Sequence, residues 1–294
     1  MAITASMVKE LREMTGAGMM DCKKALNETN GDMDAAVEFL RKNGQAKAEK
    51  KASRIAAEGV ARAAISADGK TACVIEVNSE TDFVAKNEGF VALTKAILDA
   101  AVAAKAKSLD EVKELEVNGR KVADLIVEEI GKTGEKMELG AYECLEGAGT
   151  TCYDHLGNKL STIATFTKPV ERQVGRNVAM QIASMNPTYV SRNDMPQDVV
   201  EHERSIQEEL LAKDEKLASK PEKVKAGIIE GRVSKSLQDM CLVDQEYFLD
   251  ADQKCGQYLK SNNAEVLSFV KYVVGEGIEK KEENFAAEVA AMAK

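Results

Sequence analysis

Tryptophan is absent from this sequence, and histidine and proline are scarce, with two and four residues among 294. A serine or cysteine nucleophile needs a histidine base that is held by a third group, and neither histidine stands in a recognisable signature of that kind. Long apolar runs are absent too, because no window approaches the roughly 18 to 20 apolar residues that span a bilayer. The opening segment, residues 1–9, lacks the basic-then-apolar order of a signal peptide. We therefore expect a cytoplasmic protein with no membrane segment and no catalytic triad.

Basic residues are outnumbered, with 40 Lys and Arg against 49 Asp and Glu and a net charge of -9. Proteins that bind a phosphate backbone tightly depend on clustered Lys and Arg, so binding to nucleic acid is disfavoured. A hydrophobic fraction of 44% and a charged fraction of 30% are typical of a helix-rich globular protein. A chain of this length favours two or more domains.

The six cysteines form neither a CxxC pair nor a regular disulfide framework, so we expect reduced thiols. Cys152 lies three residues before His155, but a single Cys-x-x-His is too weak to predict a zinc site. Gly131-Lys132-Thr133 resembles the tail of a phosphate-binding loop, but Ile126 stands where that motif requires a glycine. The sequence therefore predicts no metal, no cofactor and no bound nucleotide.

Residues 1–44 have the pattern of three short helices. Thr4 or Ser6 can cap the first helix and Gly16 can end it, while Gly44 is expected to end the third. The inner faces are expected to carry Met7, Val8, Leu11 and Met14, then Cys22, Ala25 and Leu26, then Ala36, Val37 and Leu40. Residues 45–57, rich in Ala and Lys, are predicted to form a helical linker.

One pattern occurs twice in the middle of the chain: a hairpin followed by a helix. In the first copy, residues 61–65 and 73–77 flank an Asp-Gly turn and residues 90–104 have helical periodicity. The second copy has strands within 144–155 and 161–167 around a Gly-Asn turn, then a helix over 170–184. This predicts an α+β fold with a duplicated core of antiparallel sheets covered by helices. Its N-subdomain would be 58–143, closed by further helix over 108–140, and its C-subdomain 144–186 with 239–277.

Residues 187–238 interrupt this scheme with a narrow apolar stripe among many charges. That stripe predicts an inserted helical hairpin that projects as a coiled-coil arm, with a seam of Val199, Ile206, Leu210, Leu217, Val224 and Ile228. The last part of the chain predicts a strand over 266–274 and a glycine turn. A C-terminal helical module over 278–294 would follow, with Phe285, Val289 and Met292 on one face.

The most informative stretch is Glu76–Lys86 (EVNSETDFVAK), where a strand-like run ends and Asp82 stands next to Phe83. One interpretation is structural: Phe83 packs into the core, and Thr81 or Asp82 caps the next helix. The other is functional: the ring is presented outward to a partner.

This stretch, together with Leu11–Leu26 (LREMTGAGMMDCKKAL), resembles the two signature regions of bacterial elongation factor Ts. The glycine turn of the second stretch is similar to the loop of ubiquitin-associated domains. The resemblance implies a nucleotide exchange factor for elongation factor Tu that carries out no covalent chemistry. It would form a heterodimer with that partner, or a dimer of such heterodimers.

The resemblance also assigns site residues. In this family the element Thr81, Asp82, Phe83 and Val84 intrudes beside the partner's magnesium and phosphate site. The small N-terminal domain grips the partner's nucleotide-binding domain, which implicates Arg12, Met19, Met20 and Lys23; of the two adjacent methionines, at least one is expected to be exposed. His155 matches a contact position approximately, and Phe248 and Leu249 fall in the region that leans on a remote domain of the partner.

Two other functions fit parts of the sequence. A non-catalytic protein-binding adaptor with a ubiquitin-associated-like head explains the head and the arm but leaves Asp82 and Phe83 without a role. A small-molecule enzyme that uses carboxylates, with Cys152 and His155, would need a deep pocket that holds residues of displaced pKa.

Overall fold

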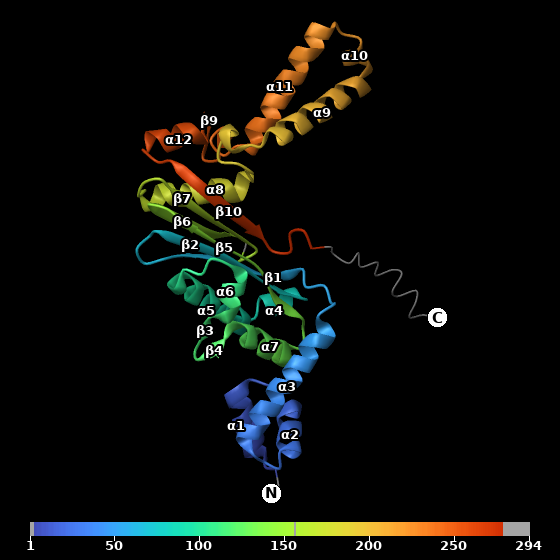
Figure 1. Ribbon diagram of the computed structural model, residues 1–294, viewed down its shortest axis with the longest axis vertical. Helices are drawn as coiled ribbons and strands as arrows, with labels where there is room; N and C mark the ends of the chain where they lie inside the picture. Colours follow the sequence, from blue (N-terminus) through green and yellow to red (C-terminus); the bar gives the residue numbers. More distant parts are fainter. Residues whose placement is uncertain (1–2, 156, 279–294) are drawn as a thin grey trace, which may run out of the picture.

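The computed structural model describes residues 3–155 and 157–278. These form an elongated α+β molecule with a three-helix module at one end, a helical hairpin at the other and two stacked antiparallel sheets between them (Figure 1). Among the described residues, every helix is too short or too polar to cross a membrane.

The N-terminal module consists of three helices around a small core of Leu11, Cys22 and Leu26, which are fully buried. The hydroxyl of Thr4 accepts a hydrogen bond from the Met7 N–H and so caps the first helix, as the sequence predicts. Met14 was expected to face inward but is 53% exposed. The helices are α1 (Ala5–Thr15), α2 (Met19–Glu28) and α3 (Met33–Lys51).

The third helix does not end at Gly44, so that prediction is wrong. It continues into the Ala- and Lys-rich segment as far as Lys51, because those residues are strong helix formers and outweigh one glycine, which costs about 1 kcal/mol inside a helix. The rest of the predicted helical linker, residues 52–57, is not helical. A side chain at Gly44 would lie 3.4 Å from the Val127 carbonyl oxygen, and Gly131 faces Gly44 across the crossing of α3 and α7. The glycine therefore allows a close helix crossing rather than a helix end.

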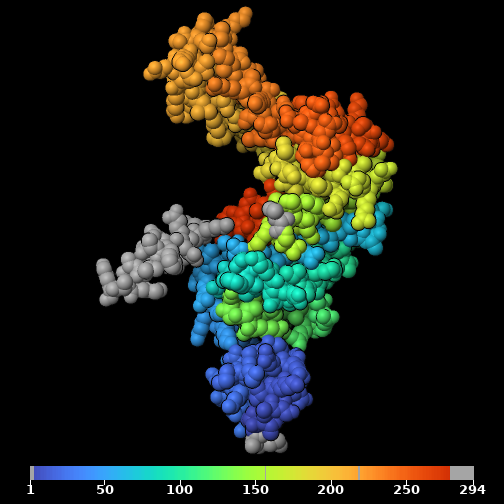
Figure 2. All heavy atoms as spheres, turned by 180° about the vertical axis from the view of Figure 1, so that it is seen from behind, coloured from blue at the N-terminus to red at the C-terminus, as the bar shows by residue number. Residues whose placement is uncertain are grey.

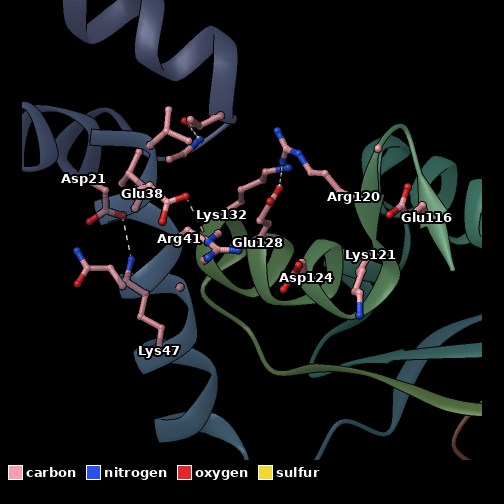
Figure 3. A pocket seen from close by; sticks show the side chains of 18 residues that line it. Asp21, Glu38, Arg41, Lys47, Glu116, Arg120, Lys121, Asp124, Glu128 and Lys132 are labelled. Carbon is pink, nitrogen blue, oxygen red and sulfur yellow. Dashed lines mark hydrogen bonds and ion pairs between the residues drawn. The ribbon is translucent and has the colours of Figure 1, made fainter. Parts of the chain in front are cut away.

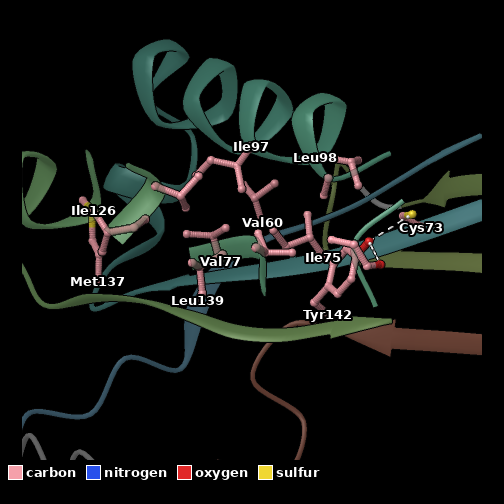
Figure 4. Close-up of a cluster of buried hydrophobic side chains, with 14 of the residues drawn as sticks. Val60, Cys73, Ile75, Val77, Ile97, Leu98, Ile126, Met137, Leu139 and Tyr142 are labelled. Atoms are coloured by element: carbon pink, nitrogen blue, oxygen red, sulfur yellow. Dashed lines mark hydrogen bonds between the residues drawn. The ribbon is translucent and has the colours of Figure 1, made fainter. Parts of the chain in front are cut away.

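The first sheet has the order β1-β2-β5, with β2 in the centre and buried along its whole length. The expected hairpin is confirmed: β1 and β2 pair antiparallel around a turn in which Gly69 has a φ of +66°. Helices cover one face of the sheet, where Val60, Ile75 and Ile97 are buried in a common core (Figure 4). The elements of this half are β1 (Glu58–Ile65), β2 (Thr71–Ser79), α4 (Asp82–Ala85), α5 (Glu88–Ala104), α6 (Leu109–Glu114), β3 (Glu116–Val117), β4 (Arg120–Lys121), α7 (Val122–Thr133) and β5 (Met137–Glu146).

Two predictions for this half need correction. The segment 108–140 is not helical throughout, because it also contains the β3–β4 hairpin and the start of β5. Gly140 is the extra residue of a β-bulge: Glu76 pairs with Ala141 and Val77 with Leu139. Residues 144–146, assigned to the second copy, complete β5 and so belong to the first sheet.

The second sheet has the order β10-β7-β6, again with a hairpin and a third strand beside the second strand of that hairpin. It packs on the first sheet, where the Ala61 N–H donates to the Asn158 carbonyl oxygen at 2.8 Å and the Ala63 N–H to Asp154 Oδ1 at 2.9 Å. Its elements are β6 (Gly149–His155), β7 (Leu160–Phe166), α8 (Arg172–Met185), β8 (Glu246–Tyr247), β9 (Asp250–Lys254), α12 (Cys255–Ser261) and β10 (Val266–Val273).

Between these elements the chain forms the expected helical hairpin, but its seam is only partly as predicted. Ile206, Leu210 and Val224 are 38 to 49% exposed, whereas Leu211 and Val233 are buried. Neighbouring residues differ by about 100° around a helix, so a stripe read one residue out of phase selects Leu210 in place of Leu211. The hairpin begins with a 3₁₀ turn, η1 (Arg192–Asp194), and contains α9 (Gln197–Lys213), α10 (Glu215–Ala218) and α11 (Glu222–Met240). The expected C-terminal helix with Phe285, Val289 and Met292 lies outside the described residues.

Candidate functional site

The stretch with Phe83 forms a single helical turn, α4, that follows directly after the central strand β2. Phe83 is 83% exposed, the largest exposed fraction among the large hydrophobic residues of the described chain. Val84 packs against the core of the first half and Ala85 is buried. The turn is therefore anchored by its third and fourth residues while the ring of its second residue points into solvent, which excludes the interpretation that Phe83 belongs to the core.

Thr81 and Asp82 give this turn a defined shape. The Thr81 hydroxyl accepts the Val84 N–H at 3.4 Å as an N-cap. Lys86 donates to Asp82 Oδ2 at 2.6 Å. This hydrogen bond is the main cause that lowers the pKa of the Asp82 carboxyl, with a smaller contribution from the nearby Lys159 charge. Asp82 is therefore a charged carboxylate beside an exposed aromatic ring at neutral pH.

His155 lies at the end of β6, in a turn that comes close to α4. It is exposed, and its Nδ1 is 2.6 Å from the Tyr153 hydroxyl. In the same turn Lys159 pairs with Glu58 at the start of β1, at 2.5 Å, and α4 packs against β1. The structure thus brings the β6–β7 turn and the Phe83 turn to neighbouring positions.

Phe248 and Leu249 lie on the other half of the molecule, in the turn between β8 and β9, near the base of the helical hairpin (Figure 1). The Phe248 N–H donates to Gln181 Oε1 at 2.8 Å, and its ring packs edge-on against Tyr247. Leu249 is 58% exposed. These two residues are not part of one site with Phe83; Leu249 is a second exposed apolar residue on the same chain, next to the half-buried Phe248.

The N-terminal module has three exposed methionines close to the connection between α1 and α2: Met14 at 53%, Met19 at 58% and Met20 at 76%. Arg12 and Lys23 are exposed beside them in the sequence. Met19 and Met20 begin α2, so both project from its first turn, and the expectation of at least one exposed methionine is met by two. The module is a lobe at one end of the molecule (Figure 2). Methionine is flexible and polarizable, which suits an adaptable binding surface.

A cleft of about 410 Å³ separates this module from the first half of the core. Its charged side chains are arranged largely in pairs (Figure 3): Lys47 bonds to Asp21 at 2.9 Å, and Arg120 bonds to Glu128. Because its charges neutralise one another, the cleft offers no obvious site for an ionic substrate.

The interpretation of the chain as a small-molecule enzyme that uses Cys152 and His155 gains no support from the structure around Cys152. Burial raises the pKa of the Cys152 thiol to about 11, so it is not a thiolate at neutral pH. In the part of the chain that the structure describes, no group of three or more His, Cys, Asp or Glu side chains is placed to hold a metal ion.

Two residues that hold the Phe83 turn were not singled out from the sequence. The Glu135 carboxylate binds the Thr81 N–H and hydroxyl, and Glu80 binds the Lys136 N–H and Arg54. Residues 80–81 and 135–136 are more than fifty positions apart, so no local pattern could have revealed these contacts.

A comparison with protein families supports the sequence resemblance. The model of the family described as Elongation factor TS matches residues 80–276. The match covers more than half of the chain, begins at the residue before Thr81 and runs through the helical hairpin into the turn after β10.

Proposed function

Since the chain belongs to the elongation factor Ts family, the nucleotide exchange factors of elongation factor Tu, we propose that it accelerates GDP release from this partner through Phe83 and Asp82. The observation that carries the proposal is the 83% exposure of the Phe83 ring on a turn whose other residues are capped and packed. The ring would wedge between elements that flank the partner's magnesium site. The Asp82 carboxylate would disturb the groups that hold the ion.

The proposed mechanism requires a difference in affinity. An exchange factor must bind the nucleotide-free partner more tightly than the loaded one, and by linkage GDP then weakens the factor by the same ratio. Phe83 supplies such a difference if its ring is buried only when the partner's site is open. Burial of one aromatic side chain contributes about 1.5 to 3 kcal/mol, which corresponds to about one to two decades in rate.

The rest of the binding energy would come from other surfaces. We propose that Met19 and Met20, with Arg12 and Lys23 beside them, dock the N-terminal module on the partner's nucleotide-binding domain. Met14 of the same module is also exposed, at 53%, and joins this proposal.

Further contacts would lie along the core. His155 is proposed to contact the partner near the Phe83 turn, and Phe248 and Leu249 to contact it at the far half of the core. The wedge would convert part of this binding energy into strain at the nucleotide site.

The domain organisation that supports this binding is also a proposal. The three-helix module would be a ubiquitin-associated-like domain and the hairpin a coiled-coil insertion. The two core halves would be related by duplication, which is supported by the shared order of a hairpin followed by a third strand. We place the boundary between them in the turn between Glu146 and Gly149, later than the sequence suggested. The proposed location is the cytoplasm.

The test is the release rate of a fluorescent GDP analogue from elongation factor Tu, followed with catalytic amounts of the wild-type chain and of Phe83→Ala. We expect Phe83→Ala to reduce the stimulated rate by about ten- to hundredfold. Leu267→Ala is the matched control, because Leu267 is also an exposed hydrophobic residue, at 55%, and lies outside the proposed contacts. Equal stimulation by wild type and Phe83→Ala would refute the wedge, and binding without any stimulation would favour the adaptor function.

A further inference from the structure

The strands β2 and β5 remain connected beyond the end of their backbone ladder. Their last paired residues are Ser79 and Met137. Past that pair, Glu80 Oε1 accepts the Lys136 N–H at 2.5 Å, and Glu135 Oε2 accepts the Thr81 N–H at 3.0 Å. Each segment thus offers a side-chain carboxylate to a backbone N–H of the other. We call Glu80, Thr81, Glu135 and Lys136 the carboxylate clamp.

Glu135 makes a second bond that reaches the helical turn itself. Its Oε1 accepts the Thr81 hydroxyl proton at 2.6 Å. With its proton directed to the carboxylate, the hydroxyl oxygen turns a lone pair toward the Val84 N–H, which it caps. Hydrogen bonds to an ionised acceptor are shorter and stronger than neutral ones, so Glu135 fixes the Thr81 rotamer and, through it, the first residues of α4.

The exposed ring has little packing of its own to hold it, because Phe83 is 83% exposed. Its direction is therefore set by the backbone of α4. Val84 and Ala85 anchor the end of this turn in the core, while the clamp anchors its start. Removal of either anchor would leave the turn attached at one end.

We propose that Glu135 is a positioning residue of the exchange site: its carboxylate holds Thr81 and thereby sets the direction in which α4 presents Phe83 to the partner. This inference rests on the proposed function of Phe83. Glu135 touches neither nucleotide nor metal and acts through the shape of the turn.

The experiment compares GDP release at increasing factor concentration for wild type, Phe83→Ala, Glu135→Ala, Glu135→Gln and the double variant Phe83→Ala/Glu135→Ala. Glu135→Ala should lower the maximal release rate by about ten- to hundredfold, because a misdirected ring no longer meets its target. The concentration for half-maximal stimulation should change by less than about twofold, since the docking surfaces stay intact. Glu135→Gln should give a rate between those of wild type and Glu135→Ala, because its amide oxygen can still accept one hydrogen bond from Thr81 but the second, ionised acceptor is lost.

The double variant separates positioning from a general effect on the fold. If Glu135 acts through Phe83, its removal has no further effect in the Phe83→Ala background, so the two losses are not additive. A double variant slower than Phe83→Ala, or a Glu135→Ala variant at the wild-type rate, overturns the inference. If thermal unfolding shows that Glu135→Ala does not fold, Thr81→Val replaces it. This variant removes the Thr81 hydroxyl that Glu135 binds, at nearly constant side-chain shape, and should likewise lower the maximal release rate by about ten- to hundredfold.

The outcomes also separate this inference from its premise. Phe83→Ala at the wild-type rate contradicts the proposed function and the inference together. A slow Phe83→Ala variant with a fast Glu135→Ala variant contradicts the role of Glu135 alone.

Discussion

Phe83 and Phe90 stand seven residues apart and have opposite environments. Phe90 belongs to α5 and is fully buried, whereas Phe83 is 83% exposed on α4. Leaving a phenylalanine in water gives up about 1.5 to 3 kcal/mol of burial free energy. The sequence favoured a role for the acid and the ring in binding a partner, because they follow directly after a strand. It could not reveal Glu135, which reaches Thr81 only once β5 is placed beside β2.

Two glycines provide a residue-scale test of the same structure. Gly59 in β1 has a φ of +148°, and an added Cβ would lie 2.2 Å from the Val77 carbonyl oxygen. Gly69 in the hairpin turn has a φ of +66°, with open space around its Cβ position. We expect Gly59→Ala to lower the free energy of unfolding by about 3 kcal/mol and Gly69→Ala by about 1 kcal/mol. Urea unfolding measures both values, and equal losses would contradict the clash described at Gly59.

At the scale of elements, the hairpins and most helices were predictable because their periodicity and turn residues are local properties. The predictions were wrong where the role of a residue depends on its contacts with a segment that is distant in the sequence. Gly44 was predicted to end a helix but allows α3 to cross α7, and Gly140 was predicted to lie in a helical segment but forms a bulge opposite β2. In the helical hairpin, the choice between Leu210 and Leu211 depends on where the partner helix lies.

The helical hairpin contains two glycines at positions where a larger side chain would meet no other segment. Gly227 and Gly231 lie inside α11 with nothing within 4 Å of their Cβ positions. We expect each Gly→Ala substitution to stabilise the hairpin by about 0.5 to 1 kcal/mol, because alanine has less backbone freedom to lose. Hydrogen exchange of the α11 amides would report this as slower exchange. Unchanged or faster exchange would show that these glycines make contacts absent from the structure.

At the scale of the whole molecule, the proposed contacts are spread along an elongated chain. The module of α1 to α3, with its exposed methionines, lies at one end, α4 lies beside the first sheet, and β9, which follows Leu249, lies near the base of the hairpin (Figure 1). Under the proposed function, several separate docking surfaces would provide the affinity, and the exposed Phe83 ring would make part of that affinity depend on the state of the partner's nucleotide site. The net charge alone made binding to nucleic acid an unfavourable expectation, but the spread of the proposed contacts needed the three-dimensional positions.

The most direct measurement is the ratio of two dissociation constants, for elongation factor Tu loaded with GDP and for the nucleotide-free partner, determined for wild type and Phe83→Ala. Linkage requires this ratio to equal the factor by which the chain weakens GDP binding. We expect the ratio to shrink by about ten- to hundredfold in Phe83→Ala, mainly through weaker binding to the nucleotide-free form. A ratio that stays the same in wild type and Phe83→Ala would contradict the account.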